Sequence, residues 1–96
     1  MPKARVWIGR VIVPESVEAK LRTRRGVTGE QVRAACEWPA RPLQSSWHDH
    51  PERGRRLILV VRDEQGRVLK VVLQPIDVAD GSWRLRTAVL ATRWGG

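Results

Sequence analysis

Three β-strand patterns in close succession dominate the second half of the chain. Residues 56–62, 67–74 and 83–92 are rich in Val and Leu. Asp63-Glu64-Gln65-Gly66 is typical of a hairpin turn, and residues 75–82 form a second turn region containing Asp80-Gly81. Successive strands joined by short turns predict an antiparallel meander, with the apolar segment 56–62 in a central place.

The first half predicts one strand and a helix. Residues 6–13 are rich in β-branched side chains and predict a first strand, which Pro14 ends. Residues 15–25 predict a helix, because acidic residues come early and basic residues late, as the helix dipole favours. Gly26 is a typical residue to end it.

A second helix is predicted over residues 29–37. Thr28 and Gln31 have the spacing of a capping box, and Val32, Ala35 and Cys36 would face the core. Residues 39–54 follow and predict one long irregular loop.

These elements predict a single α+β domain over residues 1–96 in the order β-α-α-β-β-β. Its antiparallel sheet would carry two helices packed on one face. Cys36 is the only cysteine, so no intramolecular disulfide forms. No signal-peptide pattern opens the chain and its longest apolar run, 57–61, is too short to span a bilayer, so we expect a cytoplasmic protein without a membrane partner.

The charge balance favours a polyanionic partner. Eighteen Lys and Arg residues against ten Asp and Glu give a net charge of +8. Such a field attracts phosphates, so RNA is the expected partner. An acidic protein partner, or solubility alone, would account for the same charge.

Strand alternation predicts where part of this charge lies. On the last strand it puts Arg84, Arg86 and Ala88 on one face and Trp83, Leu85, Thr87 and Val89 on the other. Lys70, Val72 and Gln74 share one face of the preceding strand. An open basic face would then hold Lys70, Arg84 and Arg86, bordered by Arg55 and Arg56, and could bind a scissile phosphate. An ordinary solvated sheet face is the alternative.

Two histidines supply the other candidate chemistry. His48 and His50 lie in Trp47-His48-Asp49-His50, and either could move a proton during RNA cleavage. We expect no metal and no cofactor, because Asp49 is the only adjacent carboxylate and no third ligand is evident. Trp47, predicted to be exposed together with Trp94, could stack on bases. A polar loop with solvated histidines is the alternative.

A further basic cluster ends the predicted first helix. It consists of Lys20, Arg22, Arg24 and Arg25. It could bind a nucleic-acid backbone or an acidic antagonist, or it could serve only the electrostatics of the helix end.

Three strings resemble the BrnT family of bacterial toxins. Residues 21–30 resemble the family's helix end, with a basic residue before Gly-Val and then a Ser or Thr cap. Residues 66–72 are similar to its Gly-Arg hairpin, and residues 84–92 to its final strand. The chain departs from the family pattern at Arg25, where histidine is usual, and at Val89, where arginine is usual. We expect no counterpart of the family's usual C-terminal helix within residues 1–96.

The resemblance implies a RelE-like fold and a metal-independent endoribonuclease of a toxin–antitoxin pair, which cleaves mRNA to block translation. It implies a cognate antitoxin protein, either in a hetero-oligomer or beside a homodimer. The residues it favours as catalytic candidates are Arg25, Arg56, Lys70, Arg84 and Arg86. A non-catalytic nucleic-acid-binding or protein-interaction module on the same fold is the alternative.

Overall fold

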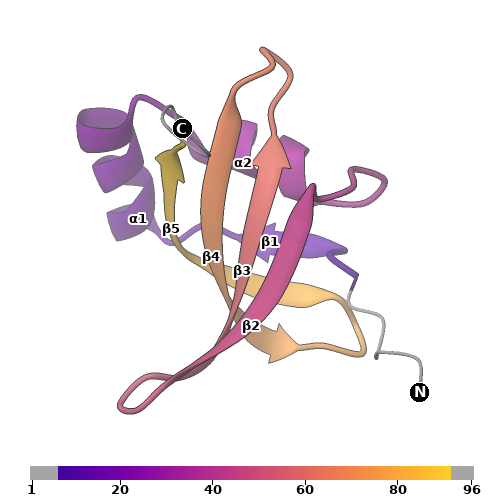
Figure 1. Cartoon of the computed structure of the whole chain (residues 1–96). Coiled ribbons are helices and arrows are strands. Elements are labelled where there is room, and N and C mark those ends of the chain that lie inside the picture. The colour runs from indigo at the N-terminus through magenta and orange to yellow at the C-terminus, as the bar shows by residue number, and fades with distance from the viewer. Residues whose placement is uncertain (1–6, 92–96) are drawn as a thin grey trace.

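The protein is an α+β structure with one five-stranded sheet, seen in a computed structural model that describes residues 7–91 (Figure 1). The strand order in the sheet is β1-β5-β4-β3-β2. The elements in chain order are β1 (Arg10–Ile12), α1 (Glu15–Lys20), the π-helical turn η1 (Leu21–Arg25), α2 (Gly29–Cys36), β2 (Gln44–His50), β3 (Gly54–Arg62), β4 (Val68–Asp77) and β5 (Ser82–Leu90).

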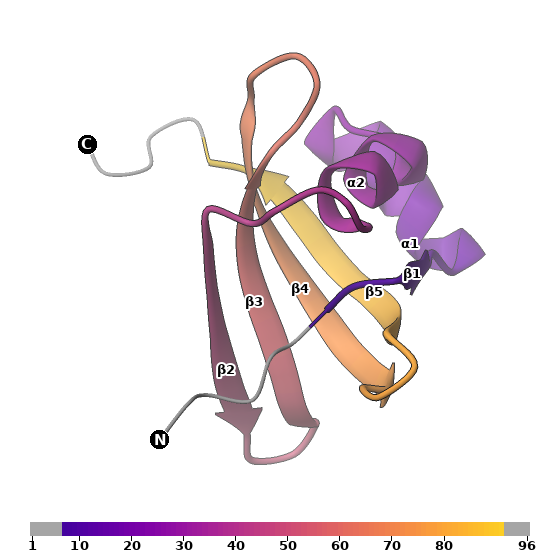
Figure 2. The same ribbon diagram turned by 90° about the vertical axis from the view of Figure 1, so that its right-hand side faces the viewer.

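The helices cover one face of the sheet and leave the other open (Figures 1 and 2). We call the uncovered side the open face and the other the helix face. The α+β class, the two helices on one face and the interior place of β3 agree with the sequence predictions.

Two sequence predictions about the sheet are wrong. The sheet is mixed rather than antiparallel, because β1 pairs in parallel with β5. The stretch 39–54 is not one irregular loop, because β2 forms within it and pairs with β3 along seven residue pairs. The observed order is therefore β-α-α-β-β-β-β, and a RelE-like fold is not established by it.

The first strand is shorter than predicted, and the helix predicted over residues 15–25 is α-helical only as far as Lys20. Only Arg10–Ile12 of the predicted strand is β-structure, with Val6 outside the described residues. The helix from Glu15 changes to a π-helical turn at Leu21, where the Thr23 hydroxyl donates to the Ala19 carbonyl (2.9 Å). Such back-bonding competes with regular helical hydrogen bonds and bends helices. Gly26 ends the turn in the left-handed conformation (φ 69°), as the sequence predicts.

Helix α2 begins at the predicted cap. The Thr28 hydroxyl accepts from the Gln31 N–H (3.1 Å), and the Gln31 side chain accepts from the Thr28 N–H (2.9 Å). Val32, Ala35 and Cys36 are buried, as predicted. At the other end of the helix, Glu37 accepts from the Val11 N–H (2.8 Å) and so covers part of the outer edge of β1.

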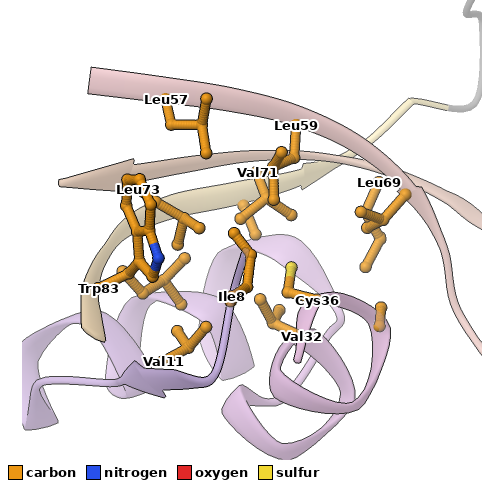
Figure 3. Close-up of a cluster of buried hydrophobic side chains, with 14 of the residues drawn as sticks. Ile8, Val11, Val32, Cys36, Leu57, Leu59, Leu69, Val71, Leu73 and Trp83 are labelled. Carbon is orange, nitrogen blue, oxygen red and sulfur yellow. The ribbon is translucent and has the colours of Figure 1, made fainter. Parts of the chain in front are cut away.

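The core lies between the helices and the helix face (Figure 3). Alternate residues of β3 and β4 enter it, among them Leu57, Leu59, Val71 and Leu73. Trp83 of β5 is fully buried there, and its indole N–H donates to the Trp7 carbonyl (3.0 Å). No helix among residues 7–91 is long and apolar enough to cross a membrane.

Candidate nucleic-acid interface

A bulge in β5 sets which side chains reach the open face. Thr87 pairs with Val72 and Leu85 pairs with Leu73, so Arg86 is an extra residue between them. Beyond the bulge the alternation is reversed, and Ala88 is buried while Thr87 and Val89 are not. The predicted grouping of Ala88 with the arginines, and of Thr87 and Val89 with Trp83, is therefore wrong.

Arg84 lies on the open face, as predicted. It is exposed, and it pairs with Gln74 of β4 and Ile12 of β1. Lys70 is on the same face of β4, exposed between Val60 and Val89. Lys70 is four positions from Gln74 along β4, so the Cα of Lys70 lies about 13 Å from the row that contains Arg84.

Arg56 joins this face from β3, paired with His48 of β2. Arg86 and Arg53 contribute to its electrostatic environment. Partial burial first, and then the positive charges of Arg86 and Arg53, lower the pKa of Arg56. Cationic groups therefore crowd around Arg56, and none of the paired open-face positions around it on β2, β3, β4 and β5 is acidic.

Arg55 does not lie on this face. Its guanidinium lies 4.4 Å from the ring centroid of Trp47, and its Nε is 3.7 Å from Asp49 Oδ1. Trp47 itself packs toward the core, with its ring centroid 5.8 Å from that of Trp83. The prediction that Trp47 is exposed is wrong, because β2 turns this side chain to the helix face. Trp94 lies outside the described residues.

The two histidines have different surroundings. His50 Nδ1 accepts from the backbone N–H groups of Glu52 and Arg53 (3.1 Å each), so it holds the β2–β3 turn. Partial burial, followed by the charges of Arg56, Arg53 and His48, lowers the pKa of His50. His48 is exposed, and its side chain makes no hydrogen bond to another residue of the described range 7–91. Of the two, His48 is the one available to move a proton.

The basic residues at the end of the predicted first helix do not form one cluster. Arg22 donates from Nε to Glu18 Oε2 (2.9 Å). Lys20 and Arg24 instead line a cavity of about 190 Å³ with Arg86. The side chain of Arg25 lies outside what the structure describes. Within the described part of the chain, no three His, Cys, Asp or Glu side chains come together as metal ligands.

One basic residue near Arg56 was not among the candidates predicted from the sequence. Arg53 lies in the β2–β3 turn, and its charge acts on both Arg56 and His50. The run Arg53-Gly54-Arg55-Arg56 was the signal that could have revealed it. Because β2 was not predicted, nothing in the sequence indicated that this run follows a hairpin turn beside the histidines.

No protein-family model matches the chain, and no similar curated protein or solved structure was found.

Proposed function

We propose that this protein binds RNA on the open face of its sheet and cleaves it without a metal, as an endoribonuclease toxin similar to the BrnT family. The observation that supports this is the gathering of Arg56, Arg84 and Arg86 with His48 at the open face and its β5 edge. The four described ion pairs use none of these three arginines.

The dimensions favour an extended polyanion over a single small anion. His48 pairs with Arg56, and Gln74 pairs with Arg84. The β3–β4 register ends at the Leu57–Leu73 pair, so Arg56 and Gln74 are the next positions of these two neighbouring strands. At about 4.8 Å per strand, the Cα atoms of His48 and Arg84 are about 14 Å apart. A row of that length matches successive phosphates of a strand, and arginine grips phosphate with two parallel hydrogen bonds.

Cleavage would use the RNA's own 2′-hydroxyl. His48 takes the hydroxyl proton, the 2′-oxygen forms a bond to the adjacent phosphorus, and the bond to the 5′-oxygen breaks as that oxygen takes a proton from solvent. Arg56, beside His48, offsets the negative charge that develops on the phosphate oxygens. The products are a 2′,3′-cyclic phosphate and a 5′-hydroxyl.

Neighbouring arginines on opposite faces give a matched test of binding. Arg56→Gln is expected to weaken binding of a single-stranded RNA at least several-fold, because it removes a phosphate contact. Arg55→Gln removes the same charge from the helix face and is expected to leave the affinity nearly unchanged. Fluorescence anisotropy with a labelled RNA measures both, and equal losses for the two variants would contradict an open-face interface.

Cleavage is tested separately, in EDTA. The wild type is expected to release 5′-hydroxyl fragments and to slow growth when expressed. His48→Gln should keep RNA affinity and lose most cleavage, and Arg84→Ala with Arg86→Ala should lose both binding and growth inhibition. Circular dichroism checks the fold of each variant.

A non-catalytic RNA-binding module is the second candidate function. It is favoured by the commitment of His50 Nδ1 to the β2–β3 turn, which leaves a single histidine for proton transfer. Tight RNA binding by a wild type that neither cuts RNA in EDTA nor slows growth would establish this module and reject the ribonuclease. The toxin proposal includes a cognate antitoxin that binds this protein. Co-purification of the protein with the product of a neighbouring gene tests this.

A further inference from the structure

A second cationic cavity lies at the edge of the open face. Lys20 and Arg24 reach it from α1 and η1, and Arg86 reaches it from β5. Its volume is about 190 Å³, and Val17, Leu21 and Thr87 complete the lining. Figure 1 shows α1 lying alongside β5 at this edge of the sheet. We call it the edge cavity.

The charges in the edge cavity have no ion-pair partner within the part of the chain that the structure describes. None of the four described ion pairs includes Lys20, Arg24 or Arg86. Arg22, between them in sequence, is paired with Glu18. Three cations around one small cavity repel one another unless an anion lies between them.

We propose that the edge cavity is a phosphate-binding subsite that takes a backbone phosphate of the same RNA strand that lies on the open face. This inference rests on the proposed function for the identity of the ligand. Arg86 connects the open face with the edge cavity. Its charge acts on Arg56 across the open face, and its side chain lines the edge cavity. The β5 bulge places Arg86 where the two regions meet.

The composition of the cavity selects a phosphate rather than a base. Its described lining contains no aromatic ring for stacking and no carboxylate that would repel the ligand. Lys and Arg together supply charge and directed N–H donors, which suit a tetrahedral anion. The subsite therefore extends the binding track without reading the RNA sequence.

Inorganic phosphate tests the subsite without RNA. Titration of the wild type, followed by amide NMR, is expected to shift the resonances of Leu21 and Thr87. Lys20→Gln with Arg24→Gln should abolish these shifts, while Arg22→Gln should keep them, because Arg22 is held by Glu18 outside the cavity. Unchanged Leu21 and Thr87 resonances in the wild type would overturn the proposal.

RNA of increasing length tests whether one strand binds the open face and the edge cavity together. Between about two and about ten nucleotides, the affinity of the double variant should fall progressively below that of the Arg22→Gln control. The slope of log affinity against log salt should become shallower by about 0.7 for the longest RNA, because the one phosphate held in the edge cavity is no longer neutralised.

The outcomes separate this inference from the proposed function. If the wild type binds RNA but the double variant matches Arg22→Gln at every length, the edge cavity is not a subsite and the open-face interface stands. If the wild type binds no RNA, the proposed function fails and the RNA subsite fails with it, even if inorganic phosphate still shifts Leu21 and Thr87. Tighter binding of polyglutamate than of RNA to the edge cavity would also overturn the inference.

Discussion

Asp63 carries a buried negative charge whose two oxygens are both hydrogen-bonded. Oδ1 accepts from the backbone N–H groups of Gln65 (3.0 Å) and Arg67 (2.8 Å), and Oδ2 accepts from Arg67 Nε (2.8 Å). Burial alone would raise the pKa of this carboxyl, but the hydrogen bonds and charge of Arg67 outweigh it and lower the pKa. Arg67 also donates to the Gly26 carbonyl (3.4 Å), which connects the β3–β4 hairpin to the end of η1.

Replacing Asp63 by Ala is expected to lower the free energy of unfolding by about 2–3 kcal/mol, because it leaves two backbone donors and a guanidinium without their acceptor. Since the pKa in the folded protein lies below the unfolded value, this stabilisation is present above about pH 4 and is lost as the pH falls. Urea denaturation at several pH values measures it. Glu64→Ala, in the same turn but exposed, is the control. Equal effects of the two substitutions would show that the Asp63 network contributes nothing.

For Cys36, burial raises the pKa, because no nearby positive charge among the described residues stabilises the thiolate. Burial, and secondarily the negative charge of Glu37, raises the pKa of the thiol to about 12. The sulfur therefore stays protonated in the folded protein and serves as a small apolar core group, as its predicted inward position on α2 implies.

At the scale of elements, the β2–β3 hairpin carries much of the candidate interface. It holds His48, His50 and Arg56 and turns at residues 51–53. The turn depends on an unprotonated Nδ1 of His50, which accepts two backbone N–H groups. The stability of the turn beside the proposed site therefore depends on the protonation state of His50.

This arrangement predicts a pH dependence of the hairpin. Because the pKa of His50 is lowered in the folded state, the unfolded chain takes up a proton first, and the contribution of His50 to stability is lost as the pH falls below about 6.5. The protection factors of the Glu52 and Arg53 amides, which are the intrinsic exchange rates divided by the observed rates, are expected to fall between pH 7 and pH 5. His50→Gln should remove this dependence, and His48→Gln should keep it. A His48→Gln variant that also lost the dependence would contradict the assignment to His50.

At the scale of the whole molecule, the two faces of the sheet have different tasks. The helix face builds the core around Trp83 and Leu73, so its residues are constrained by packing. The open face carries the uncompensated arginines of a chain with a net charge of +8. Substitutions on the open face should therefore change ligand binding far more than stability.

The net charge also predicts the ionic-strength dependence of RNA binding. If Arg56, Arg84, Arg86 and Lys70 each neutralise one phosphate, the logarithm of affinity should fall with the logarithm of salt concentration with a slope of about −2.8. Anisotropy titrations between about 50 mM and about 200 mM salt measure this slope. A slope near zero would mean that the basic face binds no phosphates, and would favour recognition of a protein partner by non-ionic contacts.

Local chemistry allowed several elements to be predicted from the sequence. The capping box at Thr28, the left-handed stop at Gly26 and the hairpin turn after Asp63 each depend on interactions within a few residues. The three apolar strand patterns were equally evident, because alternate burial of Val and Leu requires only one packed face. Part of the candidate site followed from them, since Lys70 and Arg84 were assigned to the open face by alternation alone.

Contacts between distant segments determined the features that were not predicted, which are strand β2, the parallel pairing of β1 and the bulge in β5. Strand β2 is mostly polar and contributes only Trp47 to the core, so its pairing with β3 could not be recognised locally. The parallel position of β1 depends on Val11 packing in the core and on Glu37 accepting its N–H from the far end of α2. The bulge at Arg86 reverses the alternation so that Ala88 is buried, and it gives Arg86 access to the edge cavity. Sequence alone therefore determined the class of fold and the excess of positive charge, whereas tertiary packing decided which of these charges meet, because the strand pairings that bring them together join residues far apart in the chain.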